Sequence, residues 1–265
     1  MEKRKKYTSK FFKEGLPEWK RIKDPPTSRI LYRPLSFITS SVCANLGISA
    51  NSVSYFSTLI AIIACILFII PNYICNIIGA ILVNIWLLLD CTDGNIARTV
   101  KKQPFGDFAD SISSYTLVAF LCSAMGISSY FSGGLIFEKK SIWIVLLGIL
   151  ASTSDTLMRL VYHKYKASEK ELAEKGVLEV EYDKRKDTKA TNSLLVRIES
   201  DFGIGGILPL MILIGTIFKS LDLVVIYCFI YFFFSGLVMN LKYVKKAIDK
   251  TKAIEENKIK EGKTE

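Results

Sequence analysis

The chain has 265 residues, of which 50% are hydrophobic, and its formal net charge is +10. The basic residues are scattered around long uncharged runs rather than gathered on one surface, so we do not expect a nucleic-acid-binding protein. The six cysteines include no C-x2-C pair and lie mostly in apolar runs. This placement is typical of small buried hydrophobic residues and argues against a disulfide framework or a zinc site.

Residues 1–50 form a predicted N-terminal segment that we expect in the cytoplasm and at the membrane interface. The stretch "DPPTSRILYRP" within it interrupts any helix. The semi-polar residues 35–50 predict a short amphipathic helix that lies at the interface rather than crossing the membrane. Asn51 and Ser52 then predict the N-cap of the first membrane span.

Long uncharged runs predict an all-α integral membrane protein with six transmembrane helices. Most of these runs approach or exceed the roughly 18–20 residues that cross a bilayer, and they lie at 51–70, 71–89, 111–137, 141–154, 203–218 and 223–241. The fourth reaches that length by continuing past Asp155 to about Tyr162. Helices are expected because, within hydrocarbon, a helix satisfies its own backbone donors and acceptors.

The distribution of basic residues predicts the orientation. With six spans, 32 of the 35 Lys and Arg residues fall on one side of the membrane, which the positive-inside rule makes cytoplasmic. We therefore expect both termini in the cytoplasm and attraction of the chain to anionic lipid headgroups. Residues 51–243 would form one membrane domain with a cytoplasmic loop at 164–196, whose charge predicts a solvated helix continuing the fourth span. Residues 244–265 would form a polar cytoplasmic tail.

An acidic stretch, "DCTDGNIARTVKKQPFGDFAD" at residues 90–110, ends the second span and begins the third. At about 100° per residue, one helix face carries two carboxylates, two very small side chains and one guanidinium, from Asp90, Asp93, Gly94, Ala97 and Arg98. On the next helix Gly106, Asp110 and Ser114 follow at four-residue spacing. Two antiparallel helices can therefore direct three aspartates at one point.

Converging carboxylates at membrane depth need a counter-charge. Hard oxygen ligands favour Mg²⁺ or Mn²⁺, and two such ions about 4 Å apart would clamp a diphosphate. The plainer alternative is that Asp90 and Asp93 are ordinary helix-end charges paired with Arg98, and that Asp110 is a helix cap.

These residues resemble the signature of the CDP-alcohol phosphatidyltransferase family, D-x2-D-G-x2-A-R followed after seven or eight residues by G-x3-D-x3-D. The stretch "GISANSVSYFSTL" at 47–59 is also similar to the family's entry to its first span, with Ala50 in place of the usual Pro and Ser54 in place of a Thr. "TSRILYRPLS" is more weakly similar to members that use phosphorylated polyols such as inositol phosphate.

The resemblance implies a membrane phosphotransferase in phospholipid or related biosynthesis. Two Mg²⁺ or Mn²⁺ ions would be held by Asp90, Asp93 and Asp110, and Asp93, Gly94, Ala97, Arg98 and Gly106 would contact the nucleotide. An acceptor hydroxyl would attack a CDP-alcohol donor, with CDP-diacylglycerol as the expected donor, and release CMP. The active site would open to the cytoplasm among membrane lipids.

The family's fourth acid, generally the general base, should stand at residue 114, which is Ser114. A serine hydroxyl cannot hold an abstracted proton near neutral pH, and Asp107 lies about 10 Å further towards the cytoplasm. The proton would then pass to the acceptor's phosphate, or to Asp155 or Asp201, or turnover would be slow. The alternative is an impaired relative that binds CDP-alcohol or acts as a membrane scaffold.

Four arginines are candidates for gripping an anionic acceptor: Arg29, Arg33, Arg159 and Arg197. The competing explanation is that they snorkel to lipid phosphates. "GIGG" at 203–206 predicts close helix contact, with a homodimer as a further possibility. A more remote alternative is an intramembrane prenyltransferase, which would typically carry two separated Asp-rich motifs, whereas this sequence has one.

Overall fold

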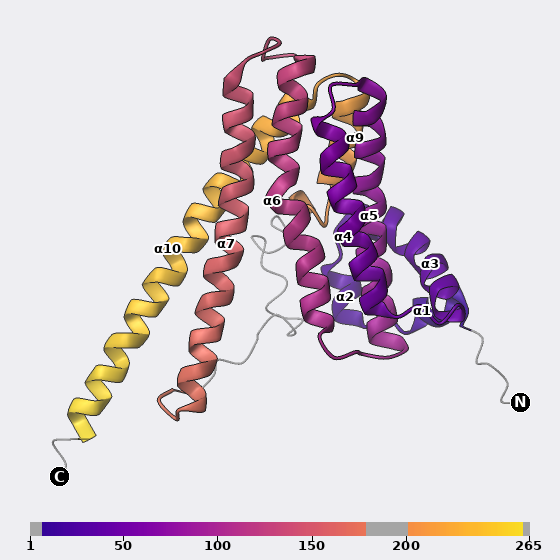
Figure 1. Ribbon diagram of the computed structural model, residues 1–265. Helices are drawn as coiled ribbons and strands as arrows, with labels where there is room; N and C mark the ends of the chain where they lie inside the picture. Colours follow the sequence, from indigo (N-terminus) through magenta and orange to yellow (C-terminus); the bar gives the residue numbers. More distant parts are fainter. Residues whose placement is uncertain (1–6, 179–200, 262–265) are drawn as a thin grey trace, which may run out of the picture.

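The computed structural model describes residues 7–178 and 201–261, and every regular element in these two ranges is helical (Figure 1). Arg197 therefore lies outside the described residues. The helices form a bundle with the N-terminal elements packed around one end (Figure 1). The all-α prediction is confirmed for the described residues.

Four short elements make up the N-terminal segment: α1 (Ser9–Glu14), α2 (Glu18–Lys23), the π-helix η1 (Ser28–Tyr32) and α3 (Arg33–Asn45). Phe12 of α1 is fully buried and belongs to a small apolar cluster with Phe37 of α3 and Ile96 of α5. The helix predicted within 35–50 is present as α3. This segment packs against the end of α5 that carries the acidic stretch.

Five helices are long and apolar enough to cross a membrane: α4 (Ala50–Ile69), α5 (Tyr73–Thr99), α6 (Gly106–Ser132), α7 (Ile142–Glu174) and α10 (Leu221–Glu261). Their outward faces expose large apolar side chains, among them Ile62, Ile81, Phe120, Leu146 and Ile230. Extended apolar surface of this kind marks contact with lipid. The chain is thus a multi-pass membrane protein.

The fifth predicted span, residues 203–218, is shorter than expected. It forms α9 (Leu208–Ile217), a helix of ten residues, and residues 203–207 are turns and a bend before it. Ten helical residues rise about 15 Å, half the thickness of the hydrocarbon core. The cause is local, because three glycines in 203–206 disfavour helix and Pro209 lies in the first turn of α9.

The first span begins slightly earlier than predicted. Ser49 is the N-cap of α4, and its hydroxyl accepts a hydrogen bond from the Ser52 backbone N–H at 3.1 Å. Asn51 instead turns to the α5–α6 connection, where its side-chain amide donates to the Pro104 carbonyl at 2.9 Å. The start of α4 is thereby tied to the turn that follows the acidic stretch.

The core is formed where α4 packs on α5 and α6, and where α7 packs on α6 and α10 (Figure 1). Helix α6 thus takes part in both halves of the core. It contains Leu87, Leu117, Leu121, Ile144 and Val225, all nearly or fully buried. On α6 and α7, Gly126 and Gly148 let the backbones meet: a Cβ added to Gly126 would lie 2.8 Å from the Ile144 carbonyl oxygen. Close packing by glycine is a common way of joining helices within a membrane.

Beyond the bundle, α7 and α10 continue side by side (Figure 1). Glu169 of α7 is buried there and bonds Lys166 at 2.6 Å and Lys250 of α10 at 2.5 Å. The predicted helix continuing the fourth span is confirmed as far as Glu174, and the predicted polar tail is continuous with α10 to Glu261. The continuation of α7 is not fully solvated, since it packs on α10.

Candidate active site

The acidic face lies at the end of α5 and the beginning of α6. The carboxyl groups of Asp90, Asp93 and Asp110 lie near enough to one another to interact electrostatically. Neighbouring carboxylates at membrane depth repel each other, and a shared proton or a bound cation relieves that repulsion. The predicted meeting of the two helix ends is therefore present in the structure.

Asp93 is oriented from a third helix. It is buried, and its Oδ2 accepts a hydrogen bond from the Ser54 hydroxyl of α4 at 2.6 Å. Deeper in the bundle, the Ser57 and Ser113 hydroxyls are hydrogen-bonded at 2.6 Å, and the Trp86 indole N–H donates to Ser113 at 2.9 Å. These buried bonds join α4, α5 and α6 directly beneath the acidic face.

Arg98 lies over the glycine of the motif. A Cβ built on Gly94 would lie 2.8 Å from Arg98 Nη2 and 2.9 Å from Nη1, so the guanidinium occupies the space that a side chain would need. Arg98 Nη2 also donates to the Asn95 side-chain oxygen at 3.3 Å. Asn95 occupies a variable position of the sequence pattern, and no sequence signal marked it as a site residue.

Arg33 and Arg29 bond within the N-terminal segment. Arg33 is buried and forms a bidentate pair with Asp24, with Nε–Oδ2 at 2.5 Å and Nη2–Oδ1 at 2.9 Å. Burial lowers the pKa of Arg33, but the hydrogen bonds that Arg33 donates to Asp24 and the nearby negative charges together outweigh burial and leave that pKa raised. Arg29 is exposed, and its Nη2 donates to the Asp24 carbonyl at 3.1 Å.

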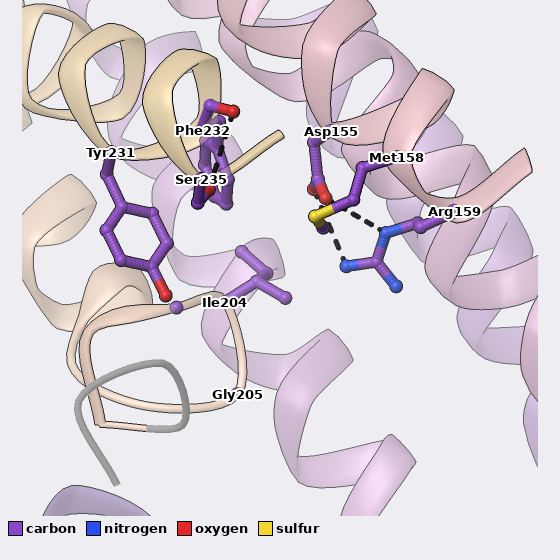
Figure 2. A pocket seen from close by; sticks show the side chains of 9 residues that line it. Asp155, Met158, Arg159, Ile204, Gly205, Tyr231, Phe232 and Ser235 are labelled. Carbon is purple, nitrogen blue, oxygen red and sulfur yellow. Dashed lines mark hydrogen bonds and ion pairs between the residues drawn. The ribbon is translucent and has the colours of Figure 1, made fainter. Parts of the chain in front are cut away.

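A cavity of about 220 Å³ lies between α7, α10 and the turn before α9 (Figure 2). Asp155, Arg159, Gly205, Tyr231 and Ser235 are among the residues that line it. Asp155 is 1% exposed and accepts a hydrogen bond from Arg159 Nε at 3.1 Å. The other guanidinium contact is the ring of Tyr115, whose centroid is 5.8 Å from Arg159 Cζ. Arg159 thus connects the cavity to Tyr115, the residue that follows Ser114 on α6.

Comparison with known families decides the classification. The model of the CDP-alcohol phosphatidyltransferase family matches residues 47–198, more than half of the chain. The chain belongs to this family. Members are in general transferases that use a CDP-alcohol donor and an alcohol acceptor in the membrane and depend on Mg²⁺ or Mn²⁺. A search among curated proteins found no match.

The departure from the family pattern is visible in the structure. Ser114 is half-buried, and its hydroxyl donates to the Ser111 carbonyl of its own helix at 3.2 Å. Asp107 is exposed and lies 3.7 Å from Lys102. No neighbouring carboxylate on this part of α6 takes the place of the missing family acid, since Asp107 is turned to solvent and Asp110 is already part of the pattern.

The oxygen ligands available suit the family's divalent metal. Among residues 7–178 and 201–261, no three His, Cys, Asp or Glu side chains form a ready metal-binding group. The proximity of Asp90 and Asp110 nevertheless favours a cation or a proton between them, and carboxylate oxygens are the ligands that Mg²⁺ and Mn²⁺ prefer. Asp93 would add a further carboxylate, whose Oδ2 already accepts a hydrogen bond from Ser54.

Proposed function

We propose that the protein transfers a phosphatidyl-type group from a CDP-alcohol, with CDP-diacylglycerol as the expected donor, to an alcohol acceptor and releases CMP. The observation that carries the proposal is the proximity of Asp90 and Asp110, from two successive helices, beside Gly94 and Arg98. In our proposal α9 completes a six-span membrane domain, α3 lies at the interface, and both termini and the active site face the cytoplasm.

The aspartates of the acidic face would hold the divalent ions. Asp90, Asp93 and Asp110 supply the oxygen ligands, and the bound ions would neutralise the donor's diphosphate and make its phosphorus more electrophilic. Ser54 would keep Asp93 in a fixed orientation, as partners behind a ligand generally do.

The small residues of the motif would admit the nucleotide. Gly94, Ala97 and Gly106 leave the helix backbones open to close approach. The Arg98 guanidinium over Gly94 would donate to phosphate oxygens, because a guanidinium matches the geometry of a phosphate. We assign these four residues to nucleotide binding.

The cavity at Arg159 would receive the acceptor alcohol. Of the candidate arginines in the described residues, Arg159 is the one that lines the cavity, and we assign it to acceptor binding. The acceptor oxygen would form a bond to the phosphorus nearest the donor's alcohol, while the bond between that phosphorus and the oxygen of CMP breaks. No group at Ser114 can take the proton that the hydroxyl loses.

Asp155 is the carboxylate that we propose for that proton, because it lines the cavity and Asp201 does not. Asp155 is already bonded to Arg159, and accepting a proton would disturb that pair, so we expect slow turnover. The second candidate function, a relative that binds CDP-alcohol without turnover, is favoured by one observation: the Ser114 hydroxyl is bonded to the Ser111 carbonyl of its own helix.

The test is CMP release by the purified protein with CDP-diacylglycerol, with Mg²⁺ or Mn²⁺, and with glycerol phosphate, inositol phosphate, serine or inositol as acceptor. We expect release with one acceptor, loss of release in Asp93→Asn, and retention in the matched control Asp107→Asn. Binding of CDP-diacylglycerol without release for any acceptor would support the second candidate instead.

A further inference from the structure

A line of buried polar side chains runs from the N-terminal segment to the acidic face. Asp24 holds Arg33 in a bidentate pair, and Arg33 Nη1 donates to the Asn95 side-chain oxygen at 3.2 Å. The same oxygen accepts from Arg98 Nη2 at 3.3 Å. One amide oxygen on α5 therefore lies between the guanidinium of Arg33, at the start of α3, and the guanidinium of the motif.

The orientation of the Asn95 amide is determined by its other end. Its nitrogen donates to the hydroxyls of Ser36 at 3.0 Å and Ser40 at 3.3 Å, both on α3. The side chain of Asn95 is 1% exposed, so rotation would face its NH₂ group against two guanidinium groups that have no lone pair to offer. The oxygen is consequently held toward Arg33 and Arg98.

The two arginines differ in how their charge is balanced. Asp24 neutralises Arg33 within the buried pair. Arg98, in contrast, is exposed and forms no ion pair with a carboxylate in the part of the chain that the structure describes. Its charge remains available to an anion, but an exposed arginine has many rotamers, and ordering one costs up to about 2 kcal/mol of side-chain entropy.

We propose that Asn95, held in place by Arg33 and Asp24, is a positioning residue that keeps the Arg98 guanidinium over Gly94, ready for the phosphates of the nucleotide. This inference rests on the proposed function, since it assigns Arg98 to a nucleotide-containing donor. Asp24 and Arg33 lie outside the residues that match the family, 47–198, so the N-terminal segment contributes to the site through Asn95.

The test is a double-mutant cycle on the full-length protein with Asn95→Ala and Arg98→Ala. The readouts are calorimetric binding of CDP-diacylglycerol in the presence of Mn²⁺ and, for active variants, separate kcat and KM values. We expect Asn95→Ala to weaken binding and raise KM about tenfold with little change in kcat. In the Arg98→Ala background, we expect Asn95→Ala to have no further effect, because residues that act through one contact are not additive.

Asn84→Ala is the matched control. Asn84 is a second side-chain amide on α5 that bonds the N-terminal segment, and it is half-buried. It accepts from the Tyr32 hydroxyl at 2.5 Å and donates to the Pro209 carbonyl at 2.9 Å. It makes no described contact with Arg98. We expect Asn84→Ala to lower the melting temperature and to leave donor affinity unchanged.

An equal loss of affinity from Asn95→Ala in both backgrounds would overturn the inference, because it would show a role in the fold alone. Binding without turnover in the wild-type protein would contradict the proposed function, while the binding cycle would still decide the role of Asn95. A wild-type protein that binds no CDP-diacylglycerol would contradict both.

Discussion

Ser54 of α4 donates a 2.6 Å hydrogen bond to Asp93 of α5, and both side chains are buried. The bond crosses between two membrane helices and occupies one oxygen of a motif carboxylate. It also accounts for a departure from the family's usual Thr, because a serine at residue 54 supplies the same hydroxyl. The residue at position 54, at the start of the first span, is thus the direct hydrogen-bond partner of Asp93 in the acidic stretch.

Replacing Ser54 by Ala should lower the affinity for the divalent metal while the protein keeps its folding stability. Partners behind a metal ligand are typically worth 10- to 100-fold in metal affinity, so we expect about tenfold more Mn²⁺ at half-maximal CMP release. The measurement is a Mn²⁺ titration of activity. Ser57→Ala removes a hydroxyl bonded to Ser113 and is the control, with an unchanged Mn²⁺ midpoint. A shared shift in both variants would assign the effect to helix packing.

Gly94→Ala should displace Arg98. The added methyl group would meet the guanidinium at 2.8 Å, and the flexible arginine has to move, so the fold should keep its stability. A lost charged hydrogen bond costs about 1.5–3 kcal/mol, which corresponds to roughly 10- to 100-fold in donor KM.

Gly79→Ala on the same helix provides the contrast to Gly94→Ala. Its Cβ would meet the Ala64 carbonyl oxygen of α4 at 3.1 Å, so a lower melting temperature and an unchanged KM are expected. Kinetics and thermal melts of both variants decide the matter. An unchanged KM in Gly94→Ala would show that Arg98 does not contact the donor.

Ser114→Asp should raise turnover. A positioned general base contributes about 10²–10⁴-fold, and a family acid would be restored one helical turn beyond Asp110. We expect at least a tenfold rise in kcat, measured as CMP release under saturating donor and acceptor. Ser114→Asn has the same shape without a basic oxygen, and its kcat should stay low. Equal rates in the two variants would mean that the proton leaves by another route.

Glu169→Gln should loosen the paired ends of α7 and α10. Glu169 is buried and forms ion pairs with two lysines. Glu171 and Lys175 also form an ion pair, but both side chains are more than 60% exposed. We expect faster hydrogen exchange around Lys250 and a loss of about 1–3 kcal/mol with unchanged KM values. In Glu171→Gln the change should stay within about 1 kcal/mol, as for other surface pairs. Equal exchange rates in both variants would contradict the role given to Glu169.

The membrane helices were largely predictable because lipid imposes a simple rule on composition. Uncharged runs in the sequence identified α4, α5, α6, α7 and α10, since each of these helices is long and apolar. Hydropathy cannot distinguish turn from helix within an apolar run, and this is why 203–218 was predicted as one span. The glycines of 203–206 and Pro209 determine the start of α9 there.

The site was predictable where spacing alone decides it and not where distant segments meet. Four-residue spacing and the turn at 100–105 placed Asp90 and Asp110 on facing helix ends. Nothing in the local pattern indicates that Arg33 bonds Asn95, because 62 residues separate them. Arg33 was expected to grip an acceptor and instead lies buried beside Asp24. Contacts of this kind depend on how the N-terminal elements pack against α5, and sequence periodicity does not predict that packing.

The π-helix η1 makes two bonds whose partners are far along the chain. The Ser28 hydroxyl donates to the Gly205 carbonyl, 177 residues later, and Tyr32 reaches Pro209 through Asn84. During synthesis the N-terminal segment emerges first, whereas Gly205 and Pro209 emerge near the end. The N-terminal segment can therefore complete these contacts only late in folding. Long-range closure of this kind slows folding. It also means that a fragment limited to the family-matched residues would leave Asn84 and Asn95 without their N-terminal partners.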